Sequence, residues 1–119
     1  MATPNYMDLF TKAGEAALET AKQFADINAK AGEELLEQQV EFAGQFMQTA
    51  ARNADLIAKA KGYQEVVGGQ AQIAQEYAQQ VLAGYKRVTE IMTEAGKAIA
   101  VAADQAAKDA RENFAKAAA

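Results

Sequence analysis

The sequence contains no cysteine, histidine, tryptophan or serine, and it has one proline, Pro4. The absence of cysteine excludes a disulfide framework and a thiol nucleophile, and it fits a reducing compartment. Without serine or histidine, the usual pairing of a nucleophile with a base cannot be built. Bundle metal sites that combine glutamate with Glu-x-x-His are excluded for the same reason. We therefore expect no enzymatic activity, no cofactor and no metal.

Long apolar runs are also missing. The longest one spans residues 98–103, whereas a membrane-spanning helix needs about 20 residues. The first residues lack the basic stretch and apolar run of a secretory signal. A formal net charge of −4 disfavours binding to nucleic acid. We expect a cytoplasmic protein without a nucleic-acid partner.

The residues that are present favour helix. Alanine dominates, and alanine, glutamine, glutamate and lysine are strong helix formers. Thr3 suits a helix N-cap and Pro4 suits the first helical position. The only paired glycines, Gly68-Gly69, favour a helix break. The sequence predicts one all-α domain over residues 1–119, a helical hairpin with arms at about 4–61 and 70–116 and a break at about 62–69.

Residues 74–106 carry an apolar line that advances by fours and threes without meeting a charged residue. This 3.5-residue repeat is typical of helices that pack lengthwise. A second line widens the face through Tyr77, Gly84, Ile91 and Ala98. Alanine covers little area, so we expect self-association, as a coiled-coil-like dimer or tetramer, to complete the core. The predicted oligomer seam comprises Ala74, Ala78, Val81, Tyr85, Val88, Met92, Ala95, Ile99, Ala102 and Ala106.

A different apolar pattern occupies the first half of the chain. The phase of its apolar line changes near Gly32, and such a stutter suggests a local kink. Residues 35–57 then carry two neighbouring apolar lines, a face too wide for one partner helix. This face predicts either an oligomer core or adsorption to a hydrophobic surface, as amphipathic helices do on lipid.

The polar side of these helices is not rich in lysine or arginine, which favours a neutral hydrophobic body over an anionic membrane. The predicted surface-binding residues are Phe10, Phe24, Leu35, Leu36, Val40, Phe42, Phe46, Met47, Leu56 and Ile57. An acidic cluster at Glu33, Glu34, Glu37 and Glu41 has the spacing of a helical carboxylate site. We interpret it as a solvated helix face, which is what charge runs usually mark.

Four stretches carry a resemblance to a known family. They are Met7-Asp-Leu-Phe10, residues 18–28, Ala60-Lys-Gly-Tyr-Gln-Glu-Val-Val67 and residues 70–77. With these stretches the chain resembles the phasins, small proteins that coat polyhydroxyalkanoate inclusions in bacteria. The resemblance covers most of the chain.

The resemblance implies a noncatalytic coat protein on intracellular polyester granules. Such a protein adsorbs to the polymer, stabilises the granules and controls their size and number. Its implied partners are the granule surface, further copies of itself and the polyhydroxyalkanoate synthase. Two alternatives remain: a structural or adaptor coiled coil that binds only proteins, and a lipid-binding amphipathic protein.

Overall fold

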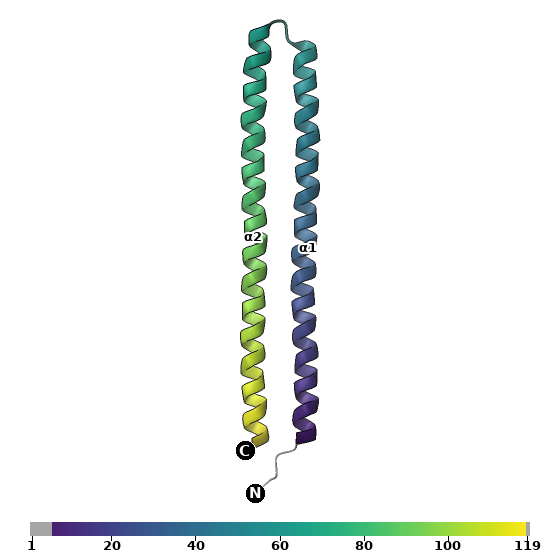
Figure 1. Ribbon diagram of the computed structural model, residues 1–119, viewed down its shortest axis with the longest axis vertical. Helices are drawn as coiled ribbons and strands as arrows, with labels where there is room; N and C mark the ends of the chain where they lie inside the picture. Colours follow the sequence, from purple (N-terminus) through teal and green to yellow (C-terminus); the bar gives the residue numbers. More distant parts are fainter. Residues whose placement is uncertain (1–5, 119) are drawn as a thin grey trace. The chain divides into compact units, whose positions relative to one another are not determined.

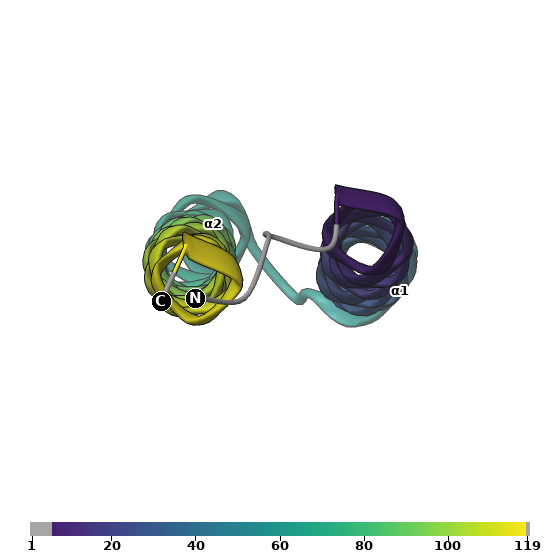
Figure 2. The same ribbon diagram turned by 90° about the horizontal axis from the view of Figure 1, so that it is seen from below.

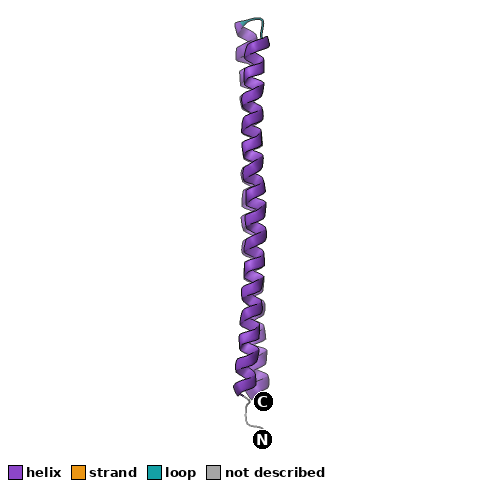
Figure 3. Cartoon of the chain, turned by 90° about the vertical axis from the view of Figure 1, so that its right-hand side faces the viewer, coloured by secondary structure: helices purple, strands orange, loops and turns teal. Residues whose placement is uncertain are grey.

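The computed structural model describes residues 6–118, which form two long α-helices (Figure 1). Helix α1 comprises Tyr6–Lys59, and helix α2 comprises Tyr63–Ala118. Figure 3 shows helix throughout the described part apart from one short loop. The predicted all-α fold with two long helices is confirmed. The expected helix start at Thr3 and Pro4 lies outside the described residues.

The loop between the helices differs from the predicted one. We expected a break over about 62–69, but α2 already begins at Tyr63, and Gly68-Gly69 lie inside it. The Val66 N–H donates to the Gly62 carbonyl at 3.3 Å, which makes Gly62 the N-cap residue of α2. The Lys61 N–H donates to the Glu65 carboxylate at 2.9 Å. A single glycine and a glutamate that accepts a loop N–H therefore suffice for the turn.

Within the glycine pair, Gly69 serves packing rather than chain reversal. A Cβ at Gly69 would lie 2.6 Å from both methyl carbons of Leu56, whereas one at Gly68 would meet nothing within 4 Å. Gly69 therefore lets α2 approach the Leu56 side chain of α1. The helical cost of a glycine, roughly 1 kcal/mol relative to alanine, is offset by this close approach.

The chain divides into two units. Unit 1 comprises Met1–Gly32 with Met92–Ala119, and unit 2 comprises Glu33–Ile91. In unit 1 the start of α1 and the end of α2 lie side by side, purple and yellow in Figures 1 and 2. Unit 2 is a helical hairpin closed by the loop at residues 60–62. The boundary falls beside Gly32, where the apolar line changes phase, and α1 continues through Gly32 as helix.

Few apolar side chains are covered within the described residues. The buried hydrophobic ones are Ile73, Ile91 and Ala102. A larger group of sixteen large hydrophobic side chains is exposed, including the predicted Phe10 and Phe46. Burying apolar surface is the main source of folding free energy, so this pattern leaves most of it unused in the single chain.

Candidate surface-binding site

The contact between the two helices of unit 2 is largely polar on the α1 side. Gln38 is buried, and Gln45, Thr49 and Asn53 are half-buried along the same line. The Gln45 Oε1 atom is buried without a hydrogen-bond partner, while its Nε2 donates weakly to Glu41 at 3.4 Å. A buried polar group contributes little net stability even when it is paired. Several polar side chains of α1 therefore take positions in the contact that apolar residues usually hold.

Two glycine contacts fix how closely the helices of unit 2 approach. A Cβ at Gly84 would overlap the Phe42 ring and would lie 2.8 Å from Nε2 of Gln38. The Phe42 ring also packs against Tyr85, with centroids 5.8 Å apart. One helical turn away, the rings of Phe46 and Tyr77 lie 6.5 Å apart, edge to face. These aromatic pairs mark one flank of the hairpin.

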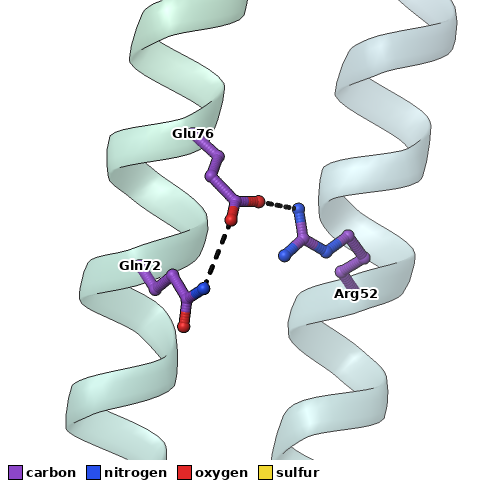
Figure 4. A network of polar contacts seen from close by, with 3 residues as sticks. All are labelled: Arg52, Gln72 and Glu76. Carbon is purple, nitrogen blue, oxygen red and sulfur yellow. Dashed lines mark hydrogen bonds and ion pairs between the residues drawn. The ribbon is translucent and has the colours of Figure 1, made fainter.

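The opposite flank of unit 2 is charged and joined by ion pairs. Arg52 and Glu76 approach to 2.5 Å, and Gln72 donates to the same carboxylate at 3.3 Å (Figure 4). The hydrogen bond from Arg52, followed by its positive charge, lowers the pKa of the Glu76 carboxyl. A second ion pair joins Arg87 to Glu34 at 3.7 Å. This polar flank orders the hairpin while it faces water.

Helix geometry assigns the remaining side chains to these flanks. Because each residue turns the helix by about 100°, Leu36, Val40, Met47 and Ile57 fall within one arc of α1, which begins beside Phe46 and faces away from Arg52. They are exposed by 60%, 66%, 71% and 56%. The second predicted apolar line of α1 therefore stays uncovered in the single chain.

The same rule applies to α2. Ala74, Ala78, Val81 and Tyr85 project on the side of the aromatic pairs, opposite Glu76 and Arg87. Between residues 34 and 58 of α1 and between Tyr63 and Ile91 of α2, no charged residue falls on this side of unit 2; Glu33, seven residues before Val40, lies at its end. We call this surface of unit 2 the apolar flank. It combines the predicted surface-binding line of α1 with the first half of the predicted seam of α2.

The ten predicted surface-binding residues divide into two groups. Six are exposed: Phe10, Leu36, Val40, Phe46, Met47 and Ile57. The other four are half-buried: Phe24, Leu35, Phe42 and Leu56. Phe42 and Leu56 sit over the glycines of α2, so their first role is to pair the helices. Phe10 and Phe24 belong to unit 1, where both line an apolar groove.

The predicted oligomer seam is also divided. Ala102 is buried, Val81, Val88, Ala95, Ile99 and Ala106 are half-buried, and Ala74, Ala78, Tyr85 and Met92 are exposed. The centre of the contact with α1 runs through Ile73, Gly84 and Ile91, beside the predicted line. Gly84 and Ile91 belong to the second line that the sequence analysis placed beside the seam, whereas Ile73 belongs to neither line. Packing of further copies on the exposed members stays a prediction.

Sequence reasoning missed several exposed apolar residues, among them Leu18, Leu82 and Val101. Leu82 lies four residues after Ala78 and three before Tyr85, so it borders the apolar flank. Its spacing was available in the sequence, but the predicted seam used Val81 instead. A wider apolar arc on α2 would have included both residues.

Other site types receive no support from the described residues. Between residues 6 and 118 no group of three or more acidic side chains is arranged to hold a metal ion. Glu34, one member of the acidic cluster, instead pairs with Arg87. Neither of the two helices, over the residues described, has an apolar stretch sufficient to cross a bilayer.

The fold and the apolar flank define an all-helical amphipathic protein whose apolar surface largely lies outside its own core. A family model described as phasin protein matches residues 8–107, and the chain belongs to the phasin family. Phasins are noncatalytic structural proteins associated with polyhydroxyalkanoate granules. The resemblance seen in the sequence is thereby confirmed. No curated protein and no solved structure is similar enough to match.

Proposed function

We propose that the apolar flank of unit 2 adsorbs to the surface of polyhydroxyalkanoate granules, so that the chain stabilises the granules and controls their size and number. The observation that carries this proposal is the uncharged surface that both helices build on one side of the hairpin. The polymer is a neutral aliphatic polyester, so it offers apolar contact without charge. A surface that has no charged side chain suits it better than it suits an anionic membrane.

The energetics of adsorption follow from exposure. Leu36, Val40, Met47 and Ile57 are each more than half exposed, and complete burial of such side chains is worth about 1.5–3 kcal/mol each. Roughly half of that value remains to be gained at a surface. Four such residues together then supply about 3–6 kcal/mol, and the polar flank keeps its contact with water. A coated granule would expose charge, which opposes fusion with its neighbours.

Adsorption is tested with aspartates placed on opposite sides of α1. Val40→Asp with Met47→Asp places two charges on the apolar flank. Gln48→Asp with Ala51→Asp adds two aspartates at exposed positions of the same helix outside it. Binding to polyhydroxybutyrate nanoparticles is measured for both variants and for the parent chain, with hydrophilic beads as the reference. We expect the first variant to bind at least tenfold more weakly than the second. Equal retention of the parent on particles and beads would refute adsorption.

Phe42 is not a suitable position for this test. Its ring rests over Gly84 and contacts Tyr85, so an aspartate there would disturb helix pairing as well as any surface contact. The choice of Val40 and Met47 avoids this ambiguity because neither side chain belongs to the α1–α2 contact line.

In the absence of a granule, we propose that further copies of the chain cover the apolar flank in a dimer or tetramer. The exposed seam residues Ala74 and Ala78 support this proposal, because small residues let helices approach closely, and the exposed Tyr85 offers apolar area beside them. Adsorption and self-association would then compete for one surface. Sedimentation of the Val40→Asp, Met47→Asp variant should show fewer oligomers than the parent chain. Retained oligomers together with lost particle binding would separate the two roles.

A granule-bound chain would also lie close to the polyhydroxyalkanoate synthase, which we propose as a further partner. The alternative function is an adaptor coiled coil that binds only proteins. The same particle experiment decides between the granule coat and the adaptor, because an adaptor has no preference for polyester over hydrophilic beads.

A further inference from the structure

An apolar groove lies within unit 1, apart from the apolar flank of unit 2. It has a volume of about 670 Å³ and is lined by residues of α1 from Leu9 to Phe24 and of α2 from Ala106 to Phe114. This volume falls in the range of about 300–1,000 Å³ that is typical of small-molecule sites. Both walls of the groove belong to one unit, so its lining is defined within that unit.

The lining explains why the groove is open. Alanines such as Ala17 and Ala110 form the walls on both helices, and their short side chains leave the space between the helices unfilled. Phe10, Phe24 and Phe114 supply aromatic surface around it. Phe10 and Phe114 are 74% and 64% exposed, so an occupant would cover apolar surface that water now meets.

Polarity limits the chemistry of an occupant. No charged side chain lines the groove, and its two polar lining residues are Thr20 of α1 and Asn113 of α2. A hydroxyl and a side-chain amide can each donate a hydrogen bond to a neutral acceptor such as an ester carbonyl. A carboxylate or an ammonium group in the groove would lose its hydration without gaining an ion pair.

The length and volume of the groove then distinguish between one aliphatic chain, two chains and a third helix as its occupant. Leu9 and Phe24 lie fifteen residues apart along α1, a distance of about 22 Å at ~1.5 Å per residue. A C–C bond of ~1.5 Å at an angle near 111° advances about 1.25 Å along a zigzag chain. About 18 chain atoms therefore span the groove, and if each takes ~30 Å³, the volume of a water molecule in the liquid, they fill roughly 540 Å³.

One extended chain thus matches the 670 Å³ of the groove, whereas two side by side would need about 1,080 Å³. A third helix, 10–12 Å across, would occupy at least about 1,700 Å³ over the same length. We propose that the groove of unit 1 binds a single extended, uncharged aliphatic chain that carries hydrogen-bond acceptors, as an aliphatic ester does. This inference does not rest on adsorption by the apolar flank.

The experiment uses the full chain, labelled with ¹⁵N, and methyl octanoate below its solubility limit, a probe of about ten chain atoms that fills roughly half of the groove. We expect saturable shifts of amides at residues 9–24 and 106–114. Ala17→Leu and Ala110→Leu each fill the groove from one wall and should weaken binding at least tenfold. Ala25→Leu makes the same change on α1 outside the groove lining and should stay within twofold of the parent.

Two further measurements test the polarity of the groove. Asn113→Leu keeps the lining apolar but removes the amide donor, so the ester should bind several-fold more weakly. Octanoate has the same chain length with a charge, and it should bind at least tenfold more weakly than the ester. Far-UV circular dichroism checks that each variant stays helical. If one of the two leucine variants loses helix, the binding measured for the other one tests the proposal.

Non-saturable shifts, shifts spread equally over Val40 and Met47 of the apolar flank, or undiminished binding to the leucine variants would overturn the proposal. Octanoate binding as tightly as the ester would overturn the requirement for an uncharged chain. Because Ala17→Leu leaves unit 2 unchanged, this variant should adsorb to polyester particles as tightly as the parent chain does. The NMR titration therefore tests ligand binding in the groove, and the particle assay separately tests granule adsorption.

Discussion

Replacement of Gly84 by alanine tests the helix contact of unit 2 most directly. Gly84 is buried, and a Cβ at this position would overlap the Phe42 ring and approach Gln38. The ring cannot stay where it is, so it must leave its contact with Tyr85 or push the helices apart. Gly68→Ala and Gly44→Ala are matched controls, because a Cβ at either position meets nothing within 4 Å.

The magnitude follows from two opposing effects. Glycine to alanine inside a helix stabilises by up to roughly 1 kcal/mol, and both controls should show this gain. At Gly84 the same gain is opposed by overpacking, which costs about 1–3 kcal/mol, and by loss of an aromatic pair worth about 0.5–1.5 kcal/mol. The gain cancels between the two variants, so we expect Gly84→Ala to be less stable than Gly68→Ala by about 1.5–4.5 kcal/mol.

Thermal unfolding followed by far-UV circular dichroism measures the difference. At ~4 °C per kcal/mol for a chain of this size, the two variants should differ in Tm by about 6–18 °C. Protein concentration must be equal and low, because self-association shifts apparent stability. If Gly84→Ala and Gly68→Ala raise the Tm by the same amount, the close approach of α2 to Phe42 does not exist in solution.

Two further substitutions test polar groups of the same hairpin. Arg52 lowers the pKa of Glu76, so the pair stabilises the fold above the ordinary glutamate value of 4.5, and this stability is lost as the pH falls through the lowered pKa. Arg52→Gln should therefore reduce the loss of Tm between pH 5 and pH 3, and an unchanged pH profile would contradict the pair. Gln45→Met removes the buried Oε1 that has no partner, and urea unfolding should show a gain of about 1 kcal/mol. A loss of stability in Gln45→Met would mean that a bound water satisfies this oxygen.

Much of the architecture was predictable from the sequence. The spacing of Thr20, Phe24, Ile27 and Ala31 places these residues on one side of α1, and all four are half-buried in the structure. Similar spacing identified the line from Leu36 to Ile57, which the hairpin leaves exposed. Helical periodicity reveals such faces because a helix repeats every 3.6 residues whatever its partner is.

The position of the loop and the centre of the contact were less predictable. Glycine propensity placed the break at Gly68-Gly69, but the value of Gly69 depends on Leu56 of the other helix. Likewise Gln38 lies at the centre of the contact although it is polar, and Gly84, a member of the second predicted line, lies there because the Phe42 ring fills the space beside it. The periodicity of one helix does not indicate which of its small residues lies opposite a large side chain of the other helix.

The predicted surface residues show the same limit. Phe42 and Phe46 differ by only four positions, yet one packs over a glycine and the other is exposed. The groove of unit 1 was not predicted at all. It arises because alanines of two segments, about ninety residues apart in the chain, face one another.

The amide-rich contact between the helices also determines how stability depends on temperature. Exposure of apolar area raises the heat capacity of unfolding, whereas exposure of polar area lowers it. With Ile73, Ile91 and Ala102 as the buried hydrophobic residues of the described chain, unfolding exposes little additional apolar area. The heat-capacity change per residue should fall below the usual 12–15 cal/mol/K, and the urea m-value should be small. The stability curve is then broad and shallow, so the folded fraction changes gradually on warming and cold denaturation lies far below freezing.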